Sequence, residues 1–145
     1  MKFLTKTAVV AMILLASVAY AKGDRTDPNA KARSDLMRTI GKNTGVLGDM
    51  AGGKAAFDAT GAEAAKAELV TASAGIGEAF KVQGAADPAS EAKPEIWTNW
   101  EEFLEDAGKL NAAATAIDAT SVEGVQAGMG ALGGACKDCH TEFRT

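Results

Sequence analysis

Hydrophobic residues recur every three or four positions in four stretches of the chain, and this period predicts four amphipathic α-helices. Asp27 and Pro28 supply a cap and a first-turn proline for the first helix, which we expect to end near residues 51–53. Thr60-Gly61-Ala62-Glu63 has the spacing of a capping box and predicts the start of a second helix, whose apolar stripe continues to Phe80.

The second half of the chain predicts a loop and two further helices. Residues 84–93 contain glycine, proline, aspartate and serine without a period, so they predict a loop, and Pro94 opens a third helix. Asp118-Ala119-Thr120-Ser121 supplies caps for a fourth helix, in which apolar residues alternate at three and four positions as far as Phe143. Because the period-two alternation of strands is almost absent, we expect an all-α fold, an antiparallel four-helix bundle.

The first 21 residues differ from the rest of the chain. Two lysines precede an apolar run at residues 8–18, and Ala19-Tyr20-Ala21 is a small-x-small cleavage signal. This run is shorter than the ~20 residues that a membrane-spanning helix needs. We therefore expect residues 1–21 to be a cleaved signal peptide that directs the protein to the periplasm without a membrane anchor, and residues 22–145 to form one domain.

The two cysteines of the chain and its single histidine stand together in Cys136-Lys137-Asp138-Cys139-His140. This C-x-x-C-H spacing is the haem-attachment pattern, in which both thiols bond to the porphyrin and the imidazole reaches the iron. On a helix the three side chains leave the same face. The motif predicts one covalently bound haem c, with His140 as an axial iron ligand.

Other chemistries for this cysteine pair have less support. A disulfide that closes so short a loop would remove little chain entropy. A thioredoxin-like dithiol motif would stand near a βαβ unit, which the pattern does not predict. A zinc site would need a fourth ligand, and the chain holds no other cysteine or histidine.

The second axial position depends on the methionines that follow the leader, namely Met37, Met50 and Met129. Met129 precedes His140 by eleven residues on the same predicted helix, a rise of ~16 Å, so we do not expect it to reach the opposite haem face. Met37 has a better claim than Met50 because it follows Arg33 by one turn, and a guanidinium there would suit a haem propionate. The alternatives are ordinary core filling for the methionine and a solvated surface for Arg33.

Two other positions are candidate haem contacts. Arg144 follows His140 by one turn, where it would lie near the haem edge or simply complement the helix dipole. Trp97 would line the haem pocket or fill the bundle core.

The sequence resembles the class II c-type cytochromes, the family that includes cytochrome c prime, over most of the chain after the leader. The motifs that carry the resemblance are Arg33-Ser34-x-x-Met37, Ser90-Glu91-Ala92-Lys93-Pro94-Glu95-Ile96-Trp97 and Leu132-Gly133-Gly134-Ala135-Cys136-Lys137-Asp138-Cys139-His140-x-x-Phe143-Arg144. The resemblance implies that Cys136, Cys139 and His140 hold the haem, and that Arg33, Ser34 and the Ser90-Glu91 turn touch its exposed edge.

The resemblance also places position 37 on the open side of the iron. High-spin members of the family leave that side without a ligand, whereas low-spin members place a methionine from the first helix there. Residues 36–48 are more similar to the low-spin group, which favours Met37 as the second ligand, although a methionine also occurs here in high-spin members without binding iron. Ser90 and Phe143 depart from the threonine and tyrosine common at their positions.

We therefore expect a one-electron carrier that turns over no substrate, and the alternative is a high-spin protein that binds nitric oxide or carbon monoxide. The leader carries Lys2 and Lys6 and no acidic residue, so the net charge of −4 for the chain becomes −6 without it. This charge disfavours nucleic acid as a partner and predicts redox proteins with positive surface patches. The sequence leaves open whether the bundle is a monomer or a homodimer.

Overall fold

A computed structural model describes residues 23–145, so the predicted signal peptide lies outside the described residues. Helix α1 spans Pro28–Ala51, with Asp27 as the N-cap and proline in the first turn. One Asp27 carboxylate oxygen accepts the backbone N–H of Ala30 at 2.8 Å. The predicted start and end of the first helix are both confirmed, because these signals act within one turn of the chain.

Helix α2, Ala59–Ala74, begins earlier than predicted and ends earlier too. Its N-cap is Asp58, whose carboxylate accepts the N–H groups of Thr60 at 3.2 Å and Gly61 at 3.1 Å. The expected capping box at Thr60 is therefore wrong, since a better acceptor two residues upstream already satisfies the free N–H groups. The predicted continuation to Phe80 is interrupted at Gly75, and a separate short helix, α3, covers Ile76–Phe80.

The third predicted helix is also divided. Pro94 precedes the short α4, Glu95–Thr98, and Asn99 leaves helical geometry before α5, Trp100–Ala116. Helix α6 spans Val122–Phe143, and its N-cap Ser121 accepts the N–H of Gly124 at 3.1 Å. The fourth helix therefore starts at one of the predicted caps and ends at the predicted residue.

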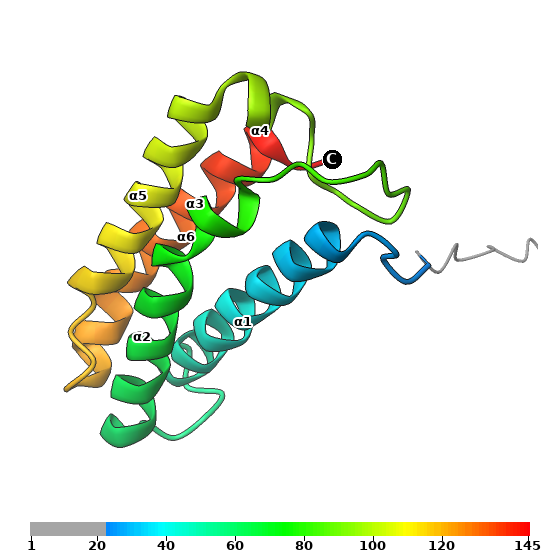
Figure 1. Cartoon of the computed structure of the whole chain (residues 1–145). Coiled ribbons are helices and arrows are strands. Elements are labelled where there is room, and N and C mark those ends of the chain that lie inside the picture. Colours follow the sequence, from blue (N-terminus) through cyan, green and yellow to red (C-terminus); the bar gives the residue numbers. More distant parts are fainter. Residues whose placement is uncertain (1–22) are drawn as a thin grey trace, which may run out of the picture.

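The long helices form an all-α four-helix bundle in which successive helices run antiparallel (Figure 1). Around the bundle, α1 packs against α2 and α6, and α5 packs against α2 and α6. The segment between α3 and α4 extends over the N-terminal end of α1, and α1 diverges from the other long helices toward that end (Figure 1). This divergence matters because it separates α1 from α6 where α1 begins and α6 ends.

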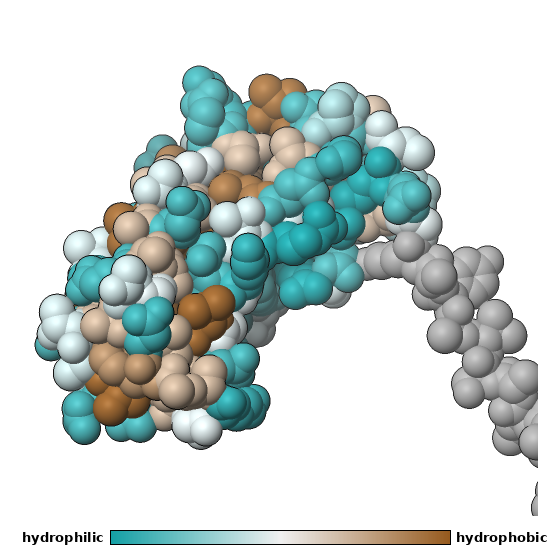
Figure 2. Space-filling view, turned by 90° about the horizontal axis from the view of Figure 1, so that it is seen from below, coloured by the Kyte–Doolittle hydropathy of each residue, from teal (hydrophilic) through white to brown (hydrophobic). Residues whose placement is uncertain are grey.

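An aromatic cluster closes the core at the same end of the molecule. The ring of Phe103 lies 5.0 Å from Phe80, 5.6 Å from Trp100 and 5.3 Å from Phe143, measured between ring centroids. On the face of the molecule that Figure 2 shows, hydrophilic residues cover much of the surface and apolar residues form smaller groups. Of the helices in residues 23–145, none combines the length and the apolar character needed to cross a membrane.

Candidate functional site

A cavity of about 450 Å³ lies between the N-terminal part of α1 and the C-terminal part of α6. Its walls come from both helices, from α3 and α5, and from residues 90–92 of the segment before α4. Of the residues predicted to form the site, all except Trp97 line it: Arg33, Ser34, Met37, Ser90, Glu91, Cys136, Cys139, His140 and Arg144. Positions far apart in sequence therefore meet around one space.

Helix α6 presents Cys136, Cys139 and His140 to this cavity from its last two turns. Burial raises the pKa of the Cys136 thiol and raises that of Cys139 to about 11. A raised pKa favours the protonated thiol over the reactive thiolate. Reactive dithiol motifs lie at helix N-termini, which lower the pKa, so this pair at a helix C-terminus lacks the electrostatics of a redox motif.

His140 stands at the edge of the cavity beside the C-terminal segment. Partial burial, and then the positive charge of Arg144, lower the pKa of its imidazole, while Glu91 acts in the opposite direction. The lowered pKa favours the neutral imidazole, which is the form that binds a metal. In the described range 23–145, no three His, Cys, Asp or Glu side chains are grouped as an all-protein metal site would need.

On the α1 side, Met37 is the one methionine of the described residues that lines the cavity. The buried Met50 lies near Gly61 of α2, and the methyl group of Met129 lies 3.5 Å from the position of a Cβ at Gly48. Both of these methionines therefore fill space between helices, as expected for core residues. The cavity therefore distinguishes Met37 from Met50, in the direction that the sequence favoured.

Arg33 is 5% exposed, so the alternative of a solvated surface residue is wrong. Its Nη1 donates to the backbone carbonyls of Val82 at 2.9 Å and Gln83 at 3.1 Å. The guanidinium carbon lies 5.6 Å from the centroid of the Phe80 ring and 5.2 Å from that of Trp97. Arg33 thus fixes the segment after α3, while it also lines the cavity.

A family model described as Cytochrome C' matches residues 29–144. This chain belongs to the cytochrome c′ family. Its all-α bundle is the fold found in the solved structures of that family, and membership implies a covalently bound haem c.

Individual relatives agree with this assignment. Cytochrome c-556 of Agrobacterium fabrum (strain C58 / ATCC 33970) is 32% identical, over 96% of this chain and 94% of that protein. The crystal structure of cytochrome c′ from Rubrivivax gelatinosus matches with a TM-score of 0.70 and 31% identity, over 81% of this chain and 94% of that one. A nitric oxide complex of a cytochrome c prime variant from Alcaligenes xylosoxidans matches with a TM-score of 0.72 and 25% identity, over 81% and 94% of the two chains.

The cavity of this cytochrome c′ family member fits a haem in its polarity. Two buried polar atoms, Arg33 Nε and Thr44 Oγ1, have no hydrogen-bond partner among residues 23–145, and both residues line the cavity. Buried polar groups are normally paired, so these atoms indicate that a further polar group belongs in this space. A propionate at Arg33 Nε would supply a charge-assisted hydrogen bond, while apolar walls would contact the macrocycle.

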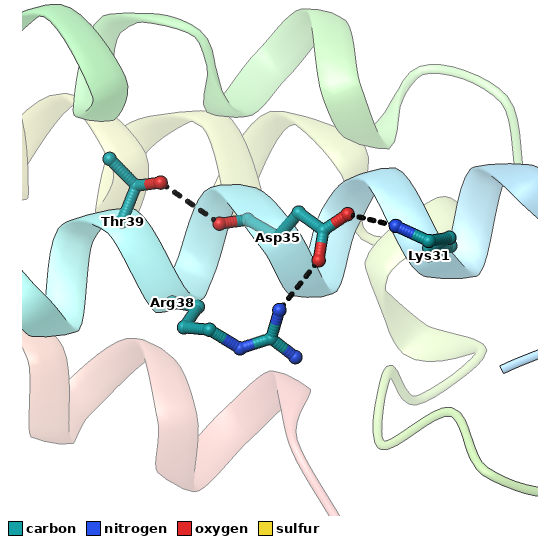
Figure 3. A network of polar contacts seen from close by, with 4 residues as sticks. All are labelled: Lys31, Asp35, Arg38 and Thr39. Carbon is teal, nitrogen blue, oxygen red and sulfur yellow. Dashed lines mark hydrogen bonds and ion pairs between the residues drawn. The ribbon is translucent and has the colours of Figure 1, made fainter. Parts of the chain in front are cut away.

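Two further arginines, Arg25 and Arg38, line the cavity although neither was predicted to do so. Arg25 precedes α1. Arg38 extends from α1, and its Nη1 lies 2.7 Å from Asp35 Oδ1 (Figure 3). Asp35 also accepts from Lys31 Nζ at 2.6 Å, so one carboxylate orients two cations (Figure 3). The i, i+3 and i, i+4 spacings in the sequence could have predicted these ion pairs of Asp35 with Arg38 and Lys31. They do not indicate that Arg38 lines a cavity.

Trp97 lies behind the site instead of lining it. Its indole Nε1 donates to the carbonyl of Phe80 at 2.7 Å, and its ring contacts Arg33. Trp97 thus holds Arg33 and the end of α3, which agrees with the alternative of core filling, and its contact with a haem stays a prediction.

The C-terminal arginine pairs with the segment before α4. Arg144 Nε donates to Glu91 Oε2 at 2.8 Å, and its Nη2 lies 2.5 Å from the same oxygen. The last carbonyls of α6 are instead bound by Lys93 Nζ, at 3.2 Å from Thr141 O and 2.8 Å from Glu142 O. The helix-dipole role considered for Arg144 thus falls to Lys93, which comes from elsewhere in the chain.

Proposed function

We propose that this chain is a periplasmic one-electron carrier with a single haem bonded to Cys136 and Cys139, and with His140 and Met37 as the iron ligands. The observation that carries the proposal is that Met37 of α1 and the motif residues of α6 line the same cavity, whereas the other methionines of the described residues do not. The predicted leader supports export to the periplasm, where c-type cytochromes of this family typically work.

Each group of residues in the site would have a separate role in holding the haem. When bound, a haem supplies an iron that takes up or releases one electron. Thioether bonds from Cys136 and Cys139 would retain it, and neutral His140 together with the Met37 thioether would fill both axial positions. Arg33 and Ser34 on α1, with Ser90 and Glu91, would contact the haem edge and its propionates. With both axial positions filled, no site is left for a substrate, which agrees with a carrier.

A second candidate function is a high-spin haem protein that binds nitric oxide or carbon monoxide. Two observations favour it: Met37 also packs against the hydrophobic core, as a filling residue would, and the similar protein from Alcaligenes xylosoxidans has a structure in complex with nitric oxide. The two functions differ only in whether Met37 binds the iron.

An absorption spectrum of the purified protein distinguishes them. We expect the oxidised protein to be low-spin, with the weak far-red band of a thioether bound to ferric haem, and the reduced protein to bind carbon monoxide slowly or weakly. A high-spin spectrum of the oxidised protein, with rapid carbon monoxide uptake after reduction, would instead establish the gas-binding function.

We also propose that the redox partners carry positive surface patches, because residues 22–145 have a net charge of −6 once Lys2 and Lys6 are removed with the leader. Electrostatic attraction weakens as salt screens it, so the second-order rate of electron transfer with a cationic partner should fall as ionic strength rises. Stopped-flow mixing measures this rate, and an uncharged reductant serves as the control whose rate should not change. A flat or rising salt profile with the cationic partner would contradict the proposal.

A further inference from the structure

The segment between α3 and α4 is tied to the residues before α1. We call residues 82–92 of this segment the strap; Figure 1 shows it passing over the N-terminal end of α1. Ser90, Glu91 and Ala92 of the strap line the cavity, and so does Arg25 in the residues before α1. Whatever holds the strap therefore holds part of the cavity wall.

Two carboxylates join these segments reciprocally. Asp27 accepts the N–H of Ala85 in the strap at 3.0 Å with Oδ2, while its Oδ1 caps α1. In return, Asp87 of the strap uses Oδ2 to accept the N–H groups of Thr26 at 2.7 Å and of Asp27 at 2.9 Å. Each segment thus supplies a carboxylate to the backbone of the other, across about 60 residues of sequence.

The backbone of the strap is shaped for this contact at Gly84. Its φ is +76°, a left-handed conformation that favours glycine. A Cβ at this position would stand 2.5 Å from Asp27 Oδ1 and 2.8 Å from Asn29 Nδ2, so a side chain would displace the carboxylate. The close approach of strap and helix cap therefore depends on glycine.

The two carboxylates are held in their charged form. Asp27 is 8% exposed, and hydrogen bonds from the backbone of Ala30 and Ala85 lower the pKa of its carboxyl group. Backbone hydrogen bonds from Asp27 and Ala89 likewise lower the pKa of Asp87. Arg33 adds a third tie through the carbonyls of Val82 and Gln83.

We propose that Asp27 and Asp87 are positioning residues that hold the strap against the cavity and thereby limit access of small molecules to the haem iron. The inference rests on the haem site proposed above, and it does not depend on which residue fills the second axial position. At its other end the strap is fixed to α6 through Glu91 and the adjacent Lys93. Loss of the carboxylate ties would loosen residues 85–87 of the strap, while Arg33 would still hold Val82 and Gln83.

The test uses Asp27→Asn and Asp87→Ala, separately and together. Alanine is needed at position 87 because one oxygen of Asp87 accepts the N–H groups of both Thr26 and Asp27, and an asparagine oxygen could still accept both. At position 27, asparagine is as good an N-cap as aspartate, so α1 should persist, but its single acceptor oxygen cannot serve both Ala30 and Ala85. We expect hydrogen exchange at the amides of Ala85 and Thr26 to accelerate roughly tenfold or more, the factor expected for loss of one hydrogen bond to a charged group. In the double variant, the loss of free energy of amide protection should be smaller than the sum of the losses in the single variants, because the two carboxylates hold the same contact.

Access to the iron is measured by carbon monoxide association after flash photolysis, in a Met37→Leu background where no thioether competes. The strap variants should associate faster than Met37→Leu alone. Asp24→Asn, which removes the same charge from an exposed position nearby, should leave both exchange and association unchanged.

Two results would overturn the proposal. Unchanged amide exchange would mean that the carboxylates do not hold the strap, and faster exchange with unchanged association would make the contact purely structural. Neither result bears on the carrier function, which fails instead if Met37→Leu and wild type already bind carbon monoxide equally fast.

Discussion

Cys136→Ser combined with Cys139→Ser is expected to yield colourless, poorly folded protein. Both thioether bonds would be lost, and without the haem the cavity of about 450 Å³ would face the core empty. At ~24 cal/mol per Å³ such a cavity corresponds to about 11 kcal/mol, an upper figure because its mouth admits water. That is comparable with the whole stability of a domain, roughly 5–15 kcal/mol.

Haem-stained denaturing electrophoresis and circular dichroism measure the two effects. Lys137→Ala is the matched control, because Lys137 lies inside the motif but is exposed and does not line the cavity. It should keep both colour and helix content. Wild-type colour that survives denaturing electrophoresis in the double serine variant would be incompatible with attachment through these cysteines.

Met37→Leu should convert the protein from low-spin to high-spin and allow rapid carbon monoxide binding. Leucine has nearly the volume of methionine, so the fold should survive at a cost below ~1.5 kcal/mol, while the iron would lose its thioether. Absorption spectra before and after reduction, with and without carbon monoxide, report the change.

Met50→Leu is the control for this second substitution. Met50 belongs to the same helix and is buried, but it does not line the cavity, so its replacement should leave the spectrum unaltered. If wild type is already high-spin, or if Met37→Leu retains the far-red band, the gas-binding function becomes the better account.

The helices and most of their ends followed from the sequence because they depend on local signals. Asp27 with Pro28 began α1, and Ser121 began α6, as expected. The capping box at Thr60 failed because Asp58, two residues earlier, is an equally local competitor that accepts two N–H groups. The breaks at Gly75 and Asn99 were also missed, since apolar spacing continues across both.

The partners of the polar side chains could not be predicted in this way. Arg33 was expected at a propionate, and its contacts to Val82 and Gln83 lie about 50 residues away in the sequence. Arg144 pairs with Glu91 across 53 residues. No periodic signal indicates which loop will pass over a given helix end, so such pairs emerge only when the helices are packed.

The sequence by itself determined the chemistry of the attachment motif and the helical character of the chain. Cys136, Cys139 and His140 share a face because spacings of three and four residues correspond to one helical turn, whatever the helix packs against. Only the tertiary structure decided that Met37, and not Met50, lines the cavity opposite that motif, and that Asp27 and Asp87 tie the strap beside it. Both outcomes depend on where α1 diverges from α6, and packing among all the helices sets that divergence.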